Sequence, residues 1–232
     1  MMTLNTAQAG PLSKAISEKQ MSPTIIMALH LLHEKLNASS LLQPWISLLP
    51  NSFESPLFWT DEELQLLEGS TIVSVVRRRK EAMRSDYDSL FGSLFAEYPE
   101  LFTKSDYTFE AFQWALCTVW SRAFVFNIDS QLVPVIVPFA DMFEHGNVES
   151  TFSLDDQDKV FRITVGQPLK AGERAYISLG AKPNSQLLMN MGFVLQNNPY
   201  NQAHSSFPSL SHSIKPHCHW MRCWRCAGTI QC

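Results

Sequence analysis

Apolar residues in the first half of the chain recur every three or four positions, which is the spacing of amphipathic helices. One such stretch begins at Ser22, a good N-cap that is followed by proline at the first helical position. Residues 60–63 (TDEE) have the form of a capping box and open a short helix. Longer periodic stretches cover 71–95 and the residues after the cap Thr108, which close at 121–124. The first half is therefore predicted to be helical.

After residue 130 the pattern becomes extended. Residues 132–139 (LVPVIVPF) form an apolar, β-branched run typical of a buried strand. Residues 150–154 and 159–165 are predicted to pair as a hairpin. Its tip, 155–158, contains three aspartates. We interpret the tip as a polar turn, because it is too short to supply the spaced ligands of a calcium loop.

One more strand and one more helix complete the pattern. Residues 173–179 (ERAYISL) read as a strand, and residues 184–191 as a short helix with Gly192 as its C-cap. Helices followed by strands predict an α+β fold.

Three chemistry-bearing side chains, Asp141, Glu144 and His145, come directly after the predicted strand 132–139. A strand end that gives way to a turn delivers side chains into a cleft from a rigid support. This stretch is therefore the candidate site. Two further histidines, His30 and His33, lie on the first helix without a partner motif, and we interpret them as structural or surface residues.

Composition limits the possible partners. The chain has 232 residues, 45% of them hydrophobic, and a net charge of −4, which fits one or two globular domains. This charge gives no broad reason to expect nucleic acid or an anionic membrane as a partner. The basic run 77–80 lies in an amphipathic stretch and is interpreted as a solvated face. Without a membrane-span run or a secretory signal, we expect an intracellular protein, with compartment and oligomeric state left open.

Four of the five cysteines crowd into the C-terminal end of the chain. The spacing of Cys223 and Cys226 is compatible with zinc, with Cys218 and Cys232 as further ligands. One such motif is a weak indication, so we favour a disordered or artefactual tail over a zinc knuckle and predict no metal site. The fifth cysteine, Cys117, lies on a helical apolar face and is interpreted as a core residue.

Taken in order, the elements from about residue 22 to 198 resemble the SET-domain protein-lysine methyltransferases, in the branch represented by Rubisco large-subunit methyltransferase. The pieces that carry this resemblance are LLHEKL, SLLPNSFESPLFW, FQWALCTVWSRAF, VPFADMFEHG and QPLKAGERAYISLGAKPNSQLLMNMGFV. The resemblance implies a SET-type β-fold of small sheets in the second half, interrupted by a largely helical insert. It divides the chain into a flexible N-terminal remnant (1–21), the insert (22–128), the C-terminal part of the SET domain (129–199) and a divergent tail (200–232).

The resemblance also implies the reaction. Enzymes of this class transfer a methyl group from S-adenosylmethionine to a lysine amine of a protein substrate. A free lysine has a pKa of roughly 10.4 and must lose its proton before it attacks, which a dry channel encourages. Catalysis is then mainly the alignment of the nitrogen lone pair with the methyl carbon.

The roles of individual residues are implied by position. Ser121, Arg122 and Asp141 correspond to residues that line the lysine channel, the first two through backbone carbonyls. Glu144 and His145 occupy the Asn-His pair that holds the cofactor, beside Asp141. Phe193 is common to the lysine channel and the cofactor pocket, and it corresponds to an aromatic that packs on the adenine or the target lysine. A salt bridge between Arg122 and Asp141 that closes the helix is an equally good interpretation of Arg122.

Three departures from the family bear on activity. Glu144 replaces an asparagine, and an acceptor-only carboxylate cannot donate as an amide does. Leu179 occupies the position of the catalytic tyrosine, and Tyr176 points to the opposite strand face. The family's Gly-rich opening strands are not found before Ser22, so we expect the first SET strands to be missing. Two alternatives therefore remain: a protein-lysine methyltransferase, intact or impaired, and a non-catalytic SET-like protein-interaction module.

Overall fold

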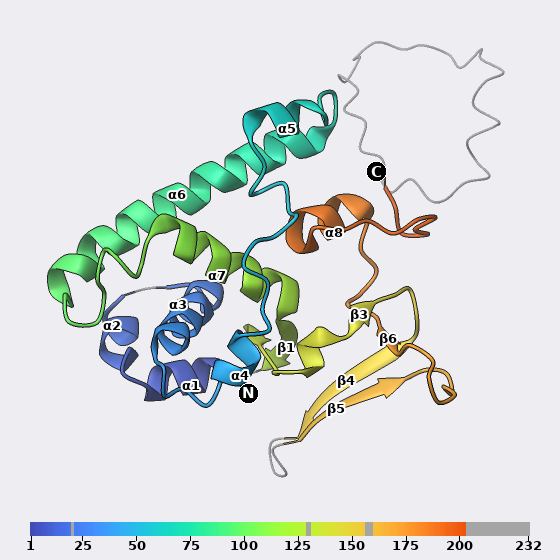
Figure 1. Ribbon diagram of the computed structural model, residues 1–232, viewed down its shortest axis with the longest axis horizontal. Coiled ribbons are helices and arrows are strands. Elements are labelled where there is room, and N and C mark those ends of the chain that lie inside the picture. The colour runs from blue at the N-terminus through green and yellow to red at the C-terminus, as the bar shows by residue number, and fades with distance from the viewer. Residues whose placement is uncertain (20, 129–130, 156–159, 203–232) are drawn as a thin grey trace, which may run out of the picture. The chain divides into compact units, whose positions relative to one another are not determined.

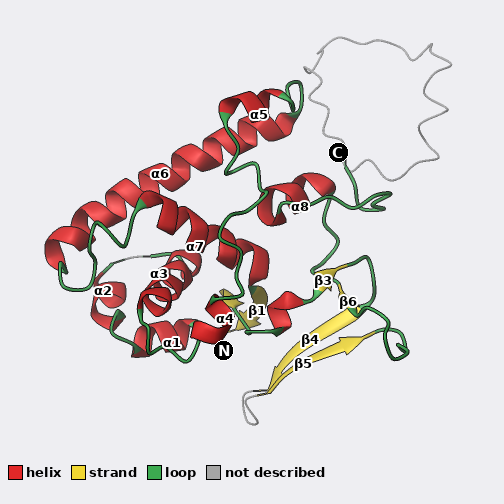
Figure 2. Ribbon diagram, viewed as in Figure 1, coloured by secondary structure: helices red, strands yellow, loops and turns green. Residues whose placement is uncertain are grey.

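Helices dominate the first half of the chain and strands are confined to the second half (Figure 2). The computed structural model describes residues 1–19, 21–128, 131–155 and 160–202, which belong to one compact unit (Figure 1). The α+β class predicted from the sequence is confirmed. The tail with its four cysteines and the tip of the predicted hairpin lie outside the described residues.

The centre of the helical half is the packing of α3 (Pro23–Leu36) against α7 (Phe109–Arg122). Both predicted N-caps are confirmed: the Ser22 hydroxyl accepts from the Ile25 N–H at 3.3 Å, and the Thr108 hydroxyl accepts from the Ala111 N–H at 3.2 Å. Each helix buries most of its apolar face, although Leu36 at the end of α3 is 47% exposed. Cys117 is 2% exposed, as expected of a core residue.

Two helices lie between α4 (Gln43–Ile46) and α7 in the chain. The predicted capping box opens α5 (Asp61–Gln65), with the Thr60 N–H donating to Glu63 at 2.8 Å and the Glu63 N–H donating to Thr60 at 3.2 Å. The long helix α6 (Thr71–Glu97) follows. Its buried residues pack in an aromatic core that includes Phe91, Phe102, Tyr107 and Phe112.

The basic run on α6 is only partly the solvated face that we predicted. Arg77 and Arg78 are exposed. In contrast, the Arg79 guanidinium lies 4.0 Å from the centre of the Trp120 ring and donates to the Asn190 side chain at 2.8 Å. The Lys80 ammonium donates to the Trp59 carbonyl. The prediction was wrong for these two residues because long cationic side chains can pack their stems and faces on apolar neighbours.

Residues 1–21, predicted to be flexible, contain two short helices, α1 (Leu4–Ala9) and α2 (Ser13–Glu18). Met2 is fully buried and bridges to Ile136, with its N–H donating to the Ile136 carbonyl at 2.8 Å. Ala7, Leu12 and Ile16 are buried as well. The prediction differs from the structure because the buried apolar residues of this segment are small or widely separated, which makes their pattern too weak to recognise.

The first sheet pairs β1 (Phe124–Ile128) with β2 (Gln131–Val135) in antiparallel register, Phe124 opposite Val135. We had not predicted β1, because we placed Phe124 at the end of the preceding helix. The predicted strand 132–139 is shorter than expected. After the bridge at Ile136 the chain turns, and Phe139 takes a positive φ of 70° as it enters the 3₁₀ turn η1 (Ala140–Met142).

The second sheet is the predicted hairpin, formed by β4 (Ser150–Asp155) and β5 (Val160–Val165). It packs on the first sheet through aromatic rings, with the Phe124 ring 5.0 Å from that of Phe152 and 4.8 Å from that of Phe161. These rings form a small apolar layer between the two hairpins.

The third sheet is a parallel pair of β3 (Glu144–His145) and β6 (Tyr176–Ile177). It brings the candidate site to the strand predicted over 173–179, of which only two residues are regular. The final helix α8 (Asn184–Met191) has the predicted bounds and ends at Gly192, whose φ is 79°. A side chain at Gly192 would also approach the Ser55 nitrogen to 3.1 Å, so glycine is required there.

Candidate functional site

Asp141 is the most deeply buried charged side chain of the candidate stretch. It lies in η1, directly after the positive-φ residue Phe139, and its side chain is 0% exposed. The Trp45 indole N–H donates to both carboxylate oxygens, at 3.0 Å and 3.1 Å. Arg122 lies 3.2 Å away from the same carboxylate and forms an ion pair with it. The two partners compensate the cost of burying this charge.

Arg122, in the last turn of α7, holds more than the carboxylate of Asp141. Its Nη1 donates to the Asp141 backbone carbonyl at 3.2 Å and lies 3.4 Å from the Met142 sulfur. The salt bridge that we predicted as one interpretation of Arg122 is confirmed. The guanidinium therefore fixes the backbone of η1 against the end of α7.

The pKa of Asp141 reflects two opposing influences. Burial raises it above its ordinary value, while the Trp45 N–H and the charge and N–H groups of Arg122 lower it, and burial has the larger effect. Loss of either partner would raise the pKa further.

Ser121 lies next to Arg122, and its side chain turns away from the candidate site. Its hydroxyl donates to the Cys117 carbonyl at 2.8 Å, back along α7. The last carbonyls of a helix have no intrahelical partner, and Ser121 and Arg122 are the last two residues of α7. What these residues can offer a ligand at this point is therefore backbone carbonyl oxygen.

Glu144 is committed to a partner on the neighbouring strand connection. Arg174 Nη1 donates to both of its carboxylate oxygens, at 2.9 Å and 3.0 Å. The Glu144 side chain is 57% exposed and the Arg174 side chain 71% exposed, so water and salt screen this ion pair. The charge of Glu144 is the main cause that raises the pKa of Arg174.

His145 has one ring nitrogen paired and one free of partners. Its Nδ1 accepts from the Leu179 backbone N–H at 3.1 Å, so the ring proton of the neutral form lies on Nε2. Nε2 is buried and has no hydrogen-bond partner among the described residues. Burial is the main cause that lowers the pKa of His145, which keeps the ring neutral near pH 7. A buried N–H donor without an acceptor is costly, so an acceptor on a bound molecule or a water at Nε2 would be stabilising.

Two other predicted residues lie beside His145. The Phe193 ring, half-buried after α8, has its centre 6.2 Å from that of His145. Leu179 is half-buried, and its backbone N–H donates to His145.

Tyr176 is 37% exposed and packs toward Gly146, where an added Cβ would meet the Tyr176 Cβ at 3.1 Å. Its neighbour Ile177 is 1% exposed, so the two side chains alternate across the strand as expected.

The structure thus gathers the predicted residues in two groups. Arg122 and Asp141 form one, and Glu144, His145, Leu179 and Phe193 surround the β3–β6 pair. Trp45, which completes the first group, was missed by the sequence interpretation. A tryptophan in an apolar connector needs a hydrogen-bond acceptor when buried, and that requirement was the available indication.

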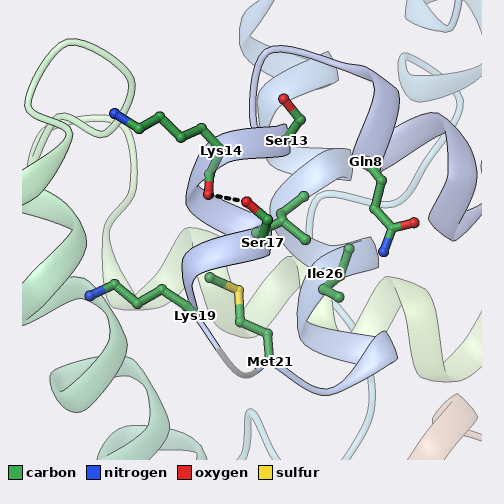
Figure 3. Close-up of a pocket in the computed structure, with 8 residues that line it drawn as sticks. Gln8, Ser13, Lys14, Ser17, Lys19, Met21 and Ile26 are labelled. Atoms are coloured by element: carbon green, nitrogen blue, oxygen red, sulfur yellow. Dashed lines mark hydrogen bonds between the residues drawn. The ribbon is translucent and has the colours of Figure 1, made fainter.

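A separate hollow lies among the N-terminal helices, with a volume of about 790 Å³ (Figure 3). It is lined by residues of α1, α2 and the start of α3, including Gln8, Lys14 and Ile26. Beside it the Ser17 hydroxyl donates to the Lys14 carbonyl at 2.9 Å, the bond drawn as a dashed line in Figure 3. None of the candidate residues lines this hollow, so it is distinct from the site around Asp141.

Two further properties concern the described part of the chain. Its residues contain no group of three or more His, Cys, Asp or Glu side chains placed to hold a metal ion. None of the helices in residues 1–19, 21–128, 131–155 and 160–202 combines the length and apolar character needed to cross a membrane.

No protein-family model matches the chain. Curated relatives are actin-histidine N-methyltransferases. The protein from Papio anubis is 27% identical over 210 residues, and that from Xenopus tropicalis is 28% identical over 211 residues. These alignments cover 87% of this chain but 35% and 36% of the relatives, so the chain spans about a third of their length.

Solved structures share the fold. The SET domain of LSMT bound to lysine and AdoHcy matches with a TM-score of 0.68 and 25% identity, over 85% of this chain and 46% of that one. Rubisco LSMT bound to AdoMet matches with a TM-score of 0.65 and 26% identity, over 84% and 44% of the two chains. The chain therefore shares the SET-domain fold of Rubisco LSMT, and its similarity to these structures and to the actin-histidine N-methyltransferases supports the SET-domain methyltransferase class.

Proposed function

We propose that this chain carries the methyl-transfer site of an S-adenosylmethionine-dependent protein N-methyltransferase. The observation that carries the proposal is the buried, unpartnered Nε2–H of His145 beside the Phe193 ring. A donor and an aromatic face at this distance suit a flat heteroaromatic group with acceptor nitrogens, such as adenine. The solved relatives bound to AdoMet and AdoHcy support the same cofactor.

The residues at this site fit the cofactor in part. His145 and Phe193 would hold the adenosyl end, and Asp141 would lie beside it. Glu144 fits less well, because Arg174 occupies both of its oxygens. An acceptor for the cofactor's ammonium group becomes free there only when this exposed pair opens. The bound cofactor would supply an activated methyl group on a positively charged sulfur.

The chain's own residues would then orient the nitrogen that receives the methyl group. Carbonyl oxygens at the end of α7 are available at Ser121 and Arg122, and they would contact the substrate side chain. Asp141 and Arg122 hold η1 against this helix end and keep the channel in one geometry. Since alignment supplies most of the rate in such a displacement, this fixed backbone is the main contribution of the protein.

For the substrate we propose a lysine side chain of a protein, with histidine as the second candidate. Lysine is the ligand of the solved LSMT domain. Histidine is favoured by a specific observation: Leu179 provides no hydroxyl at the position of the family's tyrosine, and curated relatives are actin-histidine methyltransferases. A lysine with a pKa of roughly 10.4 must lose a proton first, whereas an imidazole with a pKa of roughly 6.5 is largely neutral at pH 7.

Incubation of the full chain with methyl-labelled S-adenosylmethionine and matched lysine and histidine peptides tests the proposal. We expect label on one of the two peptide classes, and the class identifies the substrate. Label on neither would favour the alternative, a non-catalytic SET-like interaction module in which the helical half binds a protein.

The variant Leu179→Tyr separates a damaged enzyme from such a module. If only the hydroxyl is missing, this substitution should produce or increase methyl transfer to lysine peptides. Leu179→Phe is the matched control, because it adds the ring without the hydroxyl. Equal activity of the two variants would contradict a role for the hydroxyl. The division into a helical insert (22–128) and a C-terminal SET part (129–199) is proposed together with this function.

A further inference from the structure

Trp45 differs from two other buried or half-buried tryptophans in what its N–H contacts. Trp59 and Trp114 donate to backbone carbonyls, of Glu54 at 3.1 Å and of Pro50 at 2.8 Å. Trp45 instead donates to a carboxylate, that of Asp141, 96 residues later in the chain. The bond joins the helical half directly to the candidate site.

The short helix that carries Trp45 is hydrogen-bonded to the end of α3. This helix is α4 (Gln43–Ile46), and Trp45 is 1% exposed. The side-chain amide of Gln43 donates to the carbonyls of Glu34, Lys35 and Asn37 at 2.9, 3.1 and 2.8 Å. These carbonyls belong to the end of α3, where a helix leaves its last acceptors without partners. The indole is therefore attached to the core helix and has little freedom to follow Asp141 if Asp141 moves.

Asp141 is held from two sides. Trp45 contacts its carboxylate from α4, and Arg122 contacts both its carboxylate and its backbone carbonyl from α7. Among the described residues, the charged side chain within ion-pair distance of Asp141 is that of Arg122. With the carboxylate anchored by Trp45, the guanidinium has one fixed place to lie. Without that anchor, the carboxylate and the guanidinium could rotate together and the turn η1 would lose its support.

We propose that Trp45 is a positioning residue for methyl transfer: its indole N–H fixes Asp141, which fixes Arg122 and the backbone that faces the substrate. The consequence for catalysis rests on the proposed function, whereas the contact between Trp45 and Asp141 can be tested without it. The Trp45 side chain donates to Asp141 and makes no hydrogen bond to Glu144 or His145 among the described residues, so the effect should fall on the substrate side rather than on cofactor affinity.

The variant Trp45→Phe removes the N–H and retains most of the aromatic packing. Its matched control is Trp114→Phe, which also removes one indole hydrogen bond from the helical half. In Trp45→Phe we expect the pKa of Asp141, followed by carboxyl carbon NMR, to rise above its wild-type value, because the carboxylate loses a donor that stabilises its charged form. We expect kcat for the peptide to fall about tenfold or more, with the S-adenosylmethionine Kd within about twofold of wild type. Trp114→Phe should leave the Asp141 pKa and kcat unchanged.

A measurement on the unmodified chain guards against a variant that fails to fold. In a nitrogen-15 spectrum, the Trp45 indole resonance should move with pH at the same midpoint as the Asp141 carboxyl, while the Trp114 indole should not. The proposal is overturned if the Trp45 indole resonance does not move as Asp141 titrates, or if Trp45→Phe leaves the pKa of Asp141 unchanged. It is also overturned if Trp114→Phe raises the pKa of Asp141 by the same amount. A chain that binds no S-adenosylmethionine would refute the proposed function, and the NMR result would still decide the role of Trp45.

Discussion

The helical half and the strand half of this chain are stabilised in different ways. Helix α3 buries every residue from Ile26 to Leu32, and it packs on an equally apolar α7. Each sheet formed by the described residues has two strands, and β4 and β5 have no fully buried residue. Two-stranded sheets are marginal by themselves. The candidate site lies in the weaker half, so it depends on anchors such as Trp45 and Arg122 that come from the stronger one.

The largest effect is expected from a cavity in the helical core. Phe112 is 0% exposed, and Phe112→Ala should reduce the free energy of unfolding by about 3–5 kcal/mol. The matched change Phe161→Ala, in the half-exposed hairpin β4–β5, should cost clearly less. Urea unfolding followed by circular dichroism measures both. Equal costs would mean that the two halves share one core and that the contrast between them is wrong.

The next effect distinguishes a buried ion pair from an exposed one. Arg122→Met leaves the fully buried Asp141 carboxylate without its cation and should cost about 3 kcal/mol of unfolding free energy. Arg174→Met removes the exposed partner of Glu144 and should leave thermal stability nearly unchanged. Melting temperatures at low and high salt provide the readout. A large loss in Arg174→Met would show that the β3–β6 pair carries more of the stability than its exposure suggests.

A pH effect is expected in both halves. The pKa values of His30 in α3 and His145 in β3 are lowered in the folded chain from 6.5, with burial as the main cause in each. Below pH 6.5 the unfolded chain therefore binds more protons than the folded one, and stability should fall as pH decreases from about 7 toward 5. Unfolding free energies measured across this range should show a shallower slope in His30→Gln and in His145→Gln. An unchanged slope in both variants would contradict this origin.

The smallest structural effect is expected from Glu144→Asn, which restores the residue type of the family pair. It should not alter the melting temperature measurably, because the ion pair with Arg174 is exposed. It should strengthen S-adenosylmethionine binding, since an amide can both donate and accept. Glu144→Gln serves as the control for the loss of charge alone. Weaker binding in Glu144→Asn would indicate that the Glu144 carboxylate itself contacts the cofactor.

The helices could be predicted from the sequence because their information is local. The N-caps that start three helices were recognised at Ser22, Thr60 and Thr108, and the C-cap that ends α8 was recognised at Gly192. The structure confirms all four caps. The strand β1 was missed because its residues continue directly from α7, with only Ala123 between them. Nothing in that run shows locally where the helical period stops.

The site was predictable in its composition and only partly in its contacts. Asp141 and Arg122 were recognised together because opposite charges near a helix end are a familiar pair. The contact of Trp45 with Asp141 joins residues far apart in the chain, and periodicity carries no information about it. The pairing of Glu144 with Arg174 likewise follows from the parallel register of β3 and β6, which two-residue strands do not reveal in a sequence.

The most direct test of the account is titration calorimetry of the full chain with S-adenosylmethionine, in wild type and in His145→Ala. We expect binding at one site per chain in wild type, and a marked loss in the variant because it lacks the Nε2–H that donates to the cofactor. The Trp114 indole donates to the Pro50 carbonyl and not to a residue of the site, so Trp114→Phe should bind S-adenosylmethionine as wild type does. Absence of heat in wild type, or undiminished binding in His145→Ala, would contradict the assignment of this site.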